Sequence, residues 1–152
     1  MRLALFQPDI PQNTGALMRL GACFATPLDI IEPCGFPIDD KRLKRTAMDY
    51  GGICEIARHA SWQAFLADLR AHPERRLIVL STSGAVPHAA CEYRADDVLL
   101  VGRESFGVPP EVHDSADIRV RIPIAEGVRS LNVVVAAAVV IAEAQRQLGL
   151  LI

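Results

Sequence analysis

The feature of this sequence that most limits its fold is the alternation of short apolar runs with helical patterns. Continuous apolar runs are typical of strands that helices cover on both faces of a sheet. Strands that alternate with helices favour parallel βα units. We therefore expect an α/β fold, with a mainly parallel sheet flanked by helices and a single domain over residues 1–152. The clearest strands are expected at residues 2–6, 28–31, 77–80 and 98–101.

The remaining element boundaries depend on caps and prolines. Asn13 or Thr14 is expected to cap a first helix that runs to about residue 24. Ser130 is expected to cap a last helix over residues 131–148. The pattern also predicts strands at residues 53–57 and 118–122, an amphipathic helix at residues 62–71, and a helix that starts at Pro109 and Pro110.

The last predicted helix is apolar on every face over residues 133–142. Packing one flank of such a helix against a sheet leaves the other flank uncovered. We expect a second subunit to cover it, which makes the protein a homodimer; a monomer that hides the helix under loops is the alternative. The apolar run has half the ~20 residues that span a bilayer, so no membrane association is expected.

The balance of charged groups argues against one class of function. Lys and Arg number 16 against 18 Asp and Glu, which gives a formal net charge of −2. A protein that coats nucleic acid through overall positive charge is therefore not expected. The four cysteines form no C-x-x-C pair, and Gln7-Pro8-Asp9 interrupts the N-terminus before a signal-peptide core. These features predict reduced thiols in a cytoplasmic protein.

Two segments combine glycines with polar side chains near predicted strand ends. In the first, Asn13 and Arg19 lie nearly two helical turns apart, so that their amide and guanidinium groups could serve one site. A helix cap and a surface arginine are the alternative. In the second, residues 102–109 join a buried strand to the proline-started helix. Its spacing matches neither G-x-G-x-x-G nor a P-loop, which argues against dinucleotide or P-loop phosphate binding.

A third segment, residues 122–132, also follows a predicted strand and places Ser130 and Asn132 at a helix N-terminus. Free backbone N–H groups and polar side chains there can hydrogen-bond a nucleobase or a carboxylate. In parallel α/β sheets, ligands bind beyond the carboxyl ends of the strands. The second and third segments therefore predict a ligand site at that edge, with plain strand-to-helix turns as the alternative.

Together the motifs N-T-G-x-x-x-R, G-x-E-x-x-G-x-P and I-P-x(6)-S-L-N resemble the three motifs of the SpoU-type branch of the SPOUT RNA methyltransferases. The sequence is most similar to the small single-domain tRNA wobble-nucleotide 2′-O-methyltransferases, which also carry I-I-E-P-x-G-F, as residues 30–36 do here. The chain departs from their pattern at Arg103, where proline is common, at Ser105 and Phe106, which replace Thr-Arg, and at Ala142, which replaces tyrosine.

The resemblance implies a dimeric α/β fold with a C-terminal trefoil knot that binds S-adenosylmethionine and releases S-adenosylhomocysteine. It assigns cofactor contacts to Leu80, Gly102, Ile122, Ser130 and Leu131. It assigns the polar catalytic positions to Arg19, Asn13, Glu104 and Asn132. Because a sulfonium is an activated methyl donor, no metal is expected.

The implied reaction is methylation of the ribose 2′-hydroxyl of the wobble nucleotide, a cytidine or modified uridine, in the tRNA anticodon loop. We expect Arg19 to align the hydroxyl rather than act as a base, because a guanidinium is too basic to be neutral near pH 7. The alternatives are methylation of another tRNA or rRNA site and a non-catalytic RNA-binding module on the same fold. Candidate RNA contacts are the cations Lys41, Arg42, Lys44 and Arg45 and the aromatic ring of Tyr50.

Overall fold

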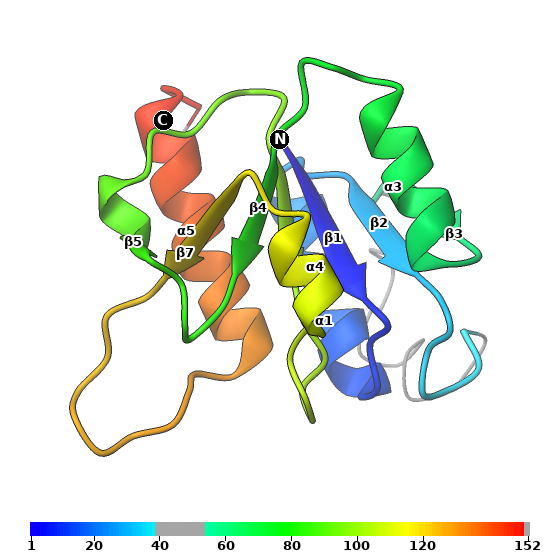
Figure 1. Cartoon of the computed structure of the whole chain (residues 1–152), viewed down its shortest axis with the longest axis horizontal. Coiled ribbons are helices and arrows are strands. Elements are labelled where there is room, and N and C mark those ends of the chain that lie inside the picture. Colours follow the sequence, from blue (N-terminus) through cyan, green and yellow to red (C-terminus); the bar gives the residue numbers. More distant parts are fainter. Residues whose placement is uncertain (39–53, 151–152) are drawn as a thin grey trace.

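A seven-stranded parallel sheet forms the centre of the protein (Figure 1). The structure, a computed structural model, describes residues 1–38 and 54–150. All six pairs of neighbouring strands are parallel, as the sequence predicts. Across the sheet the strands are β3 (Ile56–His59), β2 (Leu28–Ile31), β1 (Arg2–Phe6), β6 (Val98–Val101), β4 (Leu77–Leu80), β7 (Ile118–Arg121) and β5 (Val86–Pro87).

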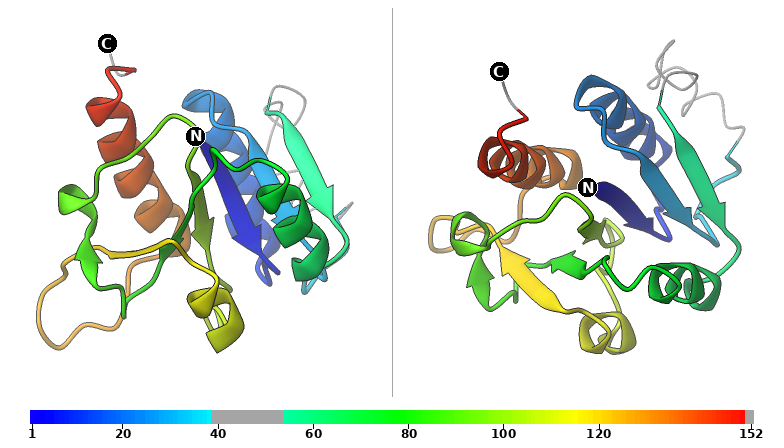
Figure 2. Two further views of the ribbon diagram at one scale, coloured as in Figure 1. Left: turned by 45° about the horizontal axis from the view of Figure 1, so that its top comes forward. Right: turned by 90° about the horizontal axis from the view of Figure 1, so that it is seen from above.

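Helices cover both faces of this sheet (Figure 2, right). Helices α1 (Pro11–Cys23) and α5 (Val133–Gln147) pack on one face, and α3 (Trp62–Arg70) and α4 (Pro110–Asp114) pack on the other. The central strands bury alternate residues against the two layers: Leu99 of β6 belongs to the core under α1 and α5, and Leu100 belongs to the core under α3 and α4. This two-sided burial explains why the strands read as continuous apolar runs.

The helix caps differ from those predicted. Helix α1 begins at Pro11 rather than after Asn13, and no side chain caps it; Thr14 instead donates a hydrogen bond from Oγ1 to the carbonyl of Ile10 at 3.3 Å. Proline suits the first helical position because it has no N–H to satisfy, so the helix starts earlier than a polar cap predicts. The prediction that Asn13 or Thr14 caps this helix is therefore wrong.

The cap of α5 is Asn132 rather than Ser130. The Asn132 side-chain oxygen accepts hydrogen bonds from the backbone N–H groups of Val134 at 2.9 Å and Val135 at 3.4 Å. Ser130 is exposed in the preceding loop. Asparagine and serine are similarly good caps, so the residue that lies next to the apolar run takes the position.

The other boundaries differ by a few residues. Strand β3 begins at Ile56, three residues later than predicted. Helix α3 ends at Arg70 and is capped by Ser61, and β7 ends at Arg121. The sequence pattern missed β5 and the 3₁₀ turn η2 (His88–Ala90), because elements of two and three residues carry no hydrophobic period.

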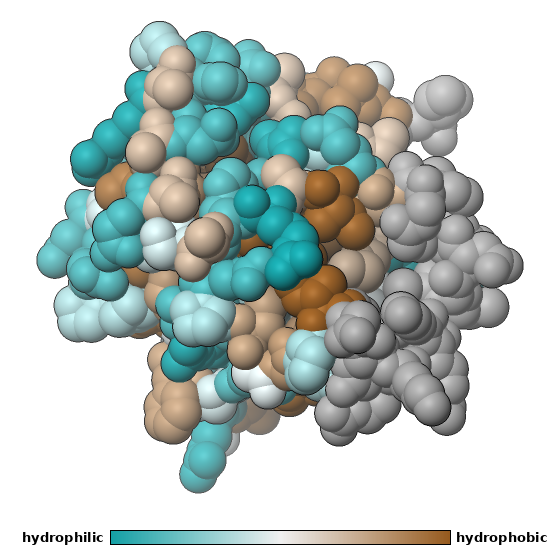
Figure 3. Space-filling model, turned by 90° about the vertical axis from the view of Figure 1, so that its right-hand side faces the viewer, coloured by the Kyte–Doolittle hydropathy of each residue, from teal (hydrophilic) through white to brown (hydrophobic). Residues whose placement is uncertain are grey.

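Figure 3 shows a hydrophilic area on the face at the β3 edge, beside a group of hydrophobic residues. Helix α3 accounts for part of it, because Gln63, Asp68 and Arg70 are exposed while Trp62 and Phe65 are buried. Within residues 1–38 and 54–150, no helix is long and apolar enough to cross a membrane.

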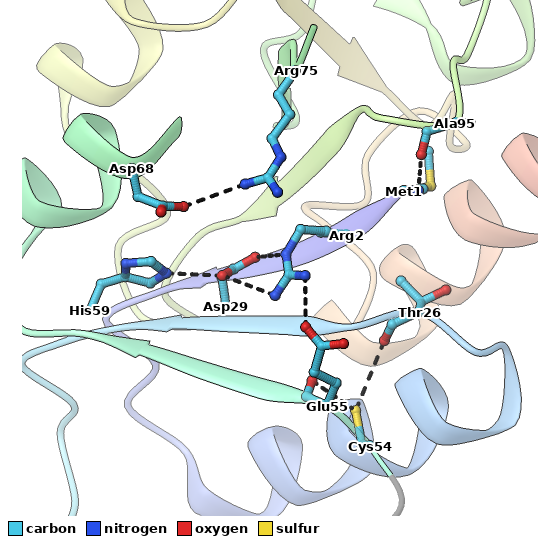
Figure 4. A network of polar contacts seen from close by, with 10 residues as sticks. All are labelled: Met1, Arg2, Thr26, Asp29, Cys54, Glu55, His59, Asp68, Arg75 and Ala95. Carbon is cyan, nitrogen blue, oxygen red and sulfur yellow. Dashed lines mark hydrogen bonds and ion pairs between the residues drawn. The ribbon is translucent and has the colours of Figure 1, made fainter. Parts of the chain in front are cut away.

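An ion-pair network joins the three strands at this edge (Figure 4). Asp29 of β2 has a side chain only 5% exposed, and its carboxylate accepts a hydrogen bond from Arg2 Nε of β1 at 2.7 Å. It also lies 2.9 Å from Nε2 of His59 on β3. Arg2 makes a second ion pair with Glu55 at 3.0 Å. The Asp29 carboxylate therefore offsets the positive charge of Arg2 among three neighbouring strands.

We expect Asp29→Ala to lower the free energy of unfolding by about 3 kcal/mol. The change leaves Arg2, whose side chain is 18% exposed, with the exposed Glu55 as its remaining ion-pair partner among the described residues. Asp68→Ala is the matched control, because Asp68 is 49% exposed and pairs with Arg75 at 3.4 Å. Its loss should cost about 0–1 kcal/mol. Urea denaturation of both variants measures the difference, and equal losses would contradict a stabilising role specific to Asp29.

Candidate active site

The carboxyl ends of β1, β4, β6 and β7 lie at one edge of the sheet, and the loops that follow them enclose a cavity of about 650 Å³. This is the edge at which parallel α/β sheets bind ligands. The cavity also extends to the first turns of α5. Every residue predicted to contact a cofactor lines it: Leu80, Gly102, Ile122, Ser130 and Leu131.

Three of the predicted catalytic residues line the same cavity. Asn13 comes from α1, Glu104 from the loop after β6, and Asn132 from the cap of α5. The side chains of Asn132 and Asn13 are in direct contact, because Nδ2 of Asn132 donates a hydrogen bond to Oδ1 of Asn13 at 3.3 Å. The cap of the last helix is thereby linked to the first turn of α1, although 119 residues separate the two positions.

Arg19 lies apart from this group. It is exposed on α1 and does not line the cavity of its own chain. Six residues turn an α-helix by about 600°, so side chains at Asn13 and Arg19 leave the helix in different directions. The predicted RNA contacts Lys41, Arg42, Lys44, Arg45 and Tyr50 lie outside the residues that the structure describes.

The loop after β6 approaches itself closely at Gly102. A Cβ on this residue would lie 2.6 Å from the carbonyl carbon of Gly107, which leaves no space for a side chain. Arg103 and Gly107 form an antiparallel bridge with two backbone hydrogen bonds of 2.9 Å, and Gly107 has a φ of 66°. The two glycines therefore allow a tight loop that forms one wall of the cavity.

Asp9 belongs to the site although the sequence motifs do not include it. Its Oδ1 accepts a hydrogen bond from the backbone N–H of Glu104 at 3.3 Å, and its own N–H donates to Oε2 of Glu104 at 3.2 Å. The hydroxyl of Ser105 also donates to Asp9. Asp9 lies in the short loop after β1, so its place at the carboxyl edge of the sheet was the signal that could have identified it.

The two carboxyl groups share their electrostatic environment. Burial, followed by a hydrogen bond with Asp9, raises the pKa of Glu104 above its ordinary value. A hydrogen bond from Glu104, assisted by one from Ser105, lowers the pKa of Asp9. Of the two carboxyl groups, Glu104 is therefore the one that takes up a proton first as the pH falls, and once ionised it can accept a proton in the cavity.

The contact between Asn132 and Asn13 can be tested apart from the helix cap. We expect Asn132→Ala to lower the free energy of unfolding by about 1 kcal/mol, because the first turn of α5 loses its cap. Asn132→Ser should restore that stability, since serine also caps helices. Serine is too short to donate to Asn13, so catalysis by this variant should stay below that of wild type.

Thermal unfolding measures the stability of both variants, and an assay of the methyl transfer that the family resemblance implies measures their activity. Full activity in Asn132→Ser would show that the Asn132 amide serves only as a cap.

The chemical character of the cavity is mixed. Its apolar wall includes Leu80, Val101 and Ile122, and its polar groups include Ser81 and Glu104. Mostly apolar walls with a few convergent polar groups are typical of small-molecule and cofactor sites of ~300–1,000 Å³. Among residues 1–38 and 54–150, no group of three or more His, Cys, Asp or Glu side chains is arranged to hold a metal ion. Fold and cavity together define an α/β protein with a cofactor-sized site at the carboxyl edge of its sheet.

The family model of the SpoU rRNA methylase family matches residues 1–142. The chain therefore belongs to the SpoU rRNA methylase family, and the resemblance that the three motifs indicated is confirmed.

Individual relatives agree over almost the whole chain. A protein of Beijerinckia indica subsp. indica, named tRNA (cytidine(34)-2′-O)-methyltransferase, is 52% identical over 149 residues, which cover 98% of this chain and 92% of the relative. A solved structure concerned with the 2-OH methylation of C/U34 on tRNA is 38% identical, with a TM-score of 0.93 over 97% of this chain and 95% of that one.

A third comparison bears on the cofactor. An AdoMet-bound rRNA methyltransferase from Sinorhizobium meliloti is 25% identical and has a TM-score of 0.88. The alignment covers 97% of this chain and 56% of that one, so the present chain corresponds to about half of the larger protein.

Proposed function

We propose that this protein transfers a methyl group from S-adenosylmethionine to the ribose 2′-hydroxyl of nucleotide 34, a cytidine or modified uridine, in the tRNA anticodon loop. One observation carries this proposal: residues from all three motif segments line the same cavity. Relatives named for methylation of cytidine 34 in tRNA support the substrate, because they align with the chain over nearly its full length. We also infer that residues 1–152 act as one methyltransferase domain and that the protein works in the cytoplasm.

The residues that line the cavity fit S-adenosylmethionine. Leu80, Ile122 and Leu131 would supply apolar surface for the cofactor, and the exposed Ser130 and the Gly102 backbone would supply polar contacts to it. The absence of a side chain at Gly102 lets the backbone approach a ligand closely. When bound, S-adenosylmethionine supplies an electrophilic methyl group on a positively charged sulfur. Glu104 adds a carboxyl group to the lining of the same cavity.

The 2′-hydroxyl is a poor nucleophile, so this chain must position it and dispose of its proton. Asn13 and Asn132 form a hydrogen-bonded pair at the cavity wall, and their remaining donors and acceptors can fix the ribose. Ionised Glu104 is a candidate acceptor for the hydroxyl proton, with Asp9 holding its carboxyl group in place. Positioning of this kind lowers barriers substantially, by up to ~7–11 kcal/mol for well-oriented groups.

We further propose a homodimer that packs through the α1–α5 face. Helix α5 buries Ala137, Val140 and Ile141 against the sheet, whereas Val135 is 49% exposed on the other flank. Arg19 is exposed on the neighbouring helix α1. In such a dimer Arg19 is available to a ribose bound at the partner subunit, where its guanidinium would align the hydroxyl and the adjacent phosphate.

Two features implied by the family resemblance remain proposals. They are the trefoil knot in the C-terminal half and the contact of tRNA with Lys41, Arg42, Lys44, Arg45 and Tyr50.

The experiment that tests this function combines calorimetry with a transfer assay. We expect S-adenosylmethionine to bind without added metal, and we expect its labelled methyl group to appear in tRNA but not in rRNA. Transfer to rRNA alone would contradict the proposed substrate, and cofactor binding without transfer to any RNA would favour a non-catalytic module.

A further inference from the structure

A second cleft adjoins the cofactor cavity. It has a volume of about 610 Å³ and lies on the side of the sheet that α3 and α4 cover. The loop after β6 separates the two spaces, and both are lined by Arg103, Phe106, Gly107 and Val108. Any long ligand that reaches the cavity from this side therefore passes over the loop and across the cleft.

The cleft has an aromatic floor. Phe6 and Trp62 line it, and their rings pack edge to face with centroids 5.8 Å apart. Both side chains are nearly buried, with exposed fractions of 4% and 5%. The floor is therefore a rigid apolar surface rather than a movable side chain.

Phe106 stands at the rim of this cleft with 86% of its surface exposed. The backbone on either side is held by the paired hydrogen bonds between Arg103 and Gly107, so the loop presents the ring from a fixed base. Within the described residues no aromatic ring stacks on Phe106. One face of the ring is thus available to a flat partner.

Arg103 supplies a polar group at the same place. Its Nη2 donates a hydrogen bond to Oε1 of Gln7, but its Nε is buried and has no hydrogen-bond partner among the described residues. A buried N–H donor without a partner is costly, so a ligand acceptor that the Arg103 side chain can turn toward would remove this cost. An exposed ring and an unsatisfied guanidinium donor therefore lie on one short loop.

The charges of the cleft favour a neutral ligand group. Glu111 lines it and is exposed, and Glu32 lines it and forms an ion pair with Arg58 at 2.6 Å. Arg58 pairs with one of these carboxylates and the guanidinium of Arg103 offsets the other, so the cleft has no excess of positive charge to hold a phosphate. A nucleobase is uncharged and offers both acceptors and amino donors. Single-stranded RNA loops present such bases unstacked, and proteins commonly bind them by stacking on aromatic rings.

We propose that this second cleft binds the base of a nucleotide adjacent to the one that is methylated, with Phe106 stacked on the base and Arg103 donating a hydrogen bond to its edge. This inference rests on the proposed function, since an anticodon loop supplies unpaired neighbours on both sides of its target. Phe106 thereby selects RNAs in which the base next to the methylated nucleotide is unpaired and can stack flat on the ring.

The test measures RNA binding, so that it does not depend on catalysis. Fluorescence anisotropy follows a labelled anticodon stem-loop RNA in saturating S-adenosylhomocysteine. We expect Phe106→Ala to weaken binding by roughly ten- to hundredfold, the range for loss of one base stack. Phe106→Trp should retain wild-type affinity because it keeps a stacking surface. Leu150→Ala is the matched control, since Leu150 is 60% exposed and lines neither space.

Abasic RNAs identify the partner of the ring. An abasic nucleotide on one side of position 34 should weaken binding to the wild-type protein by the same factor as Phe106→Ala, with no further loss when both changes are combined. The inference would be overturned if, at both neighbouring positions, the loss caused by the abasic nucleotide multiplies with the loss caused by Phe106→Ala. It would also be overturned if Phe106→Ala binds the RNA as tightly as the wild-type protein, or if this substitution changes the oligomeric state of the protein.

The same samples separate this inference from the proposed function. If the wild-type protein methylates another site yet shows the Phe106 and abasic effects, only the proposed function fails. If the wild-type protein methylates nucleotide 34 and Phe106→Ala has an unchanged KM for tRNA, only the inference about the second cleft fails. An absence of RNA binding by the wild-type protein would overturn both.

Discussion

The Arg19→Ala variant should bind S-adenosylmethionine as tightly as the wild-type protein while its rate of methyl transfer falls by about 10²–10³-fold, the loss typical of one removed electrostatic stabiliser. The reason is that Arg19 lies outside the cofactor cavity of its own chain, on the exposed surface of α1, and is proposed to align the ribose hydroxyl. Calorimetry with the cofactor and single-turnover transfer to tRNA measure the two quantities separately.

Two further variants sharpen this prediction. Arg19→Lys keeps the positive charge but loses the planar fork that can hold two oxygens at once, so its rate should stay well below that of wild type. Arg70→Ala is the matched control, because Arg70 is an exposed arginine at the end of α3 on the other face of the sheet. Near-wild-type turnover by Arg19→Lys would exclude a two-point contact.

The second large effect is expected at Gly102. A methyl group there would lie 2.6 Å from the carbonyl carbon of Gly107, so Gly102→Ala must displace the loop that lines both the cavity and the second cleft. Overpacking of this kind costs about 1–3 kcal/mol, which corresponds to a roughly 5- to 150-fold loss in cofactor affinity if the strain is relieved by opening the loop.

Gly127→Ala is the control for this substitution. Gly127 has a φ of 84°, no atom lies near its potential Cβ, and it does not line the cavity. Alanine there should cost stability through backbone strain but leave cofactor affinity unchanged. Calorimetric titration of both variants with S-adenosylmethionine gives the comparison, and equal affinities would show that the loop after β6 does not shape the cofactor site.

Much of the fold follows from the sequence because burial on both faces leaves a simple signal. The strands β1, β2, β4 and β6 have the predicted bounds, since each is a short, mainly apolar run that a polar residue or a glycine follows. Caps were less predictable. Asn132 and Ser130 are similar capping residues two positions apart, and only the packing of the first turn decides between them.

The site was predictable to the extent that its residues follow strands. Gly102 and Ile122 come directly after β6 and β7, and the topology of a parallel sheet brings them to one edge. Asp9 lies in the short loop after β1, but no motif marks it. The spacing of Asn13 and Arg19 suggested that both side chains could serve one site, but only Asn13 lines the cavity of its own chain. Six residues do not make a whole number of helical turns, so the two side chains leave the helix in different directions.

The second cleft had no sequence signal of its own. Phe106 is one exposed aromatic residue in a polar loop, and Trp62 belongs to a helix 44 positions earlier in the chain. Only the packing of α3 and α4 beside the loop after β6 brings these residues to a common space.

The most direct test of the proposed function is to map the methyl group on tRNA. Unmodified and native tRNAs would be treated with the protein and S-adenosylmethionine, and the 2′-O-methylated position would be located by nuclease digestion and mass spectrometry, with Arg19→Ala as the inactive control. We expect a new methyl group on the ribose of nucleotide 34 and at no other position. A methyl group at another tRNA position, or in rRNA alone, would contradict the proposed function.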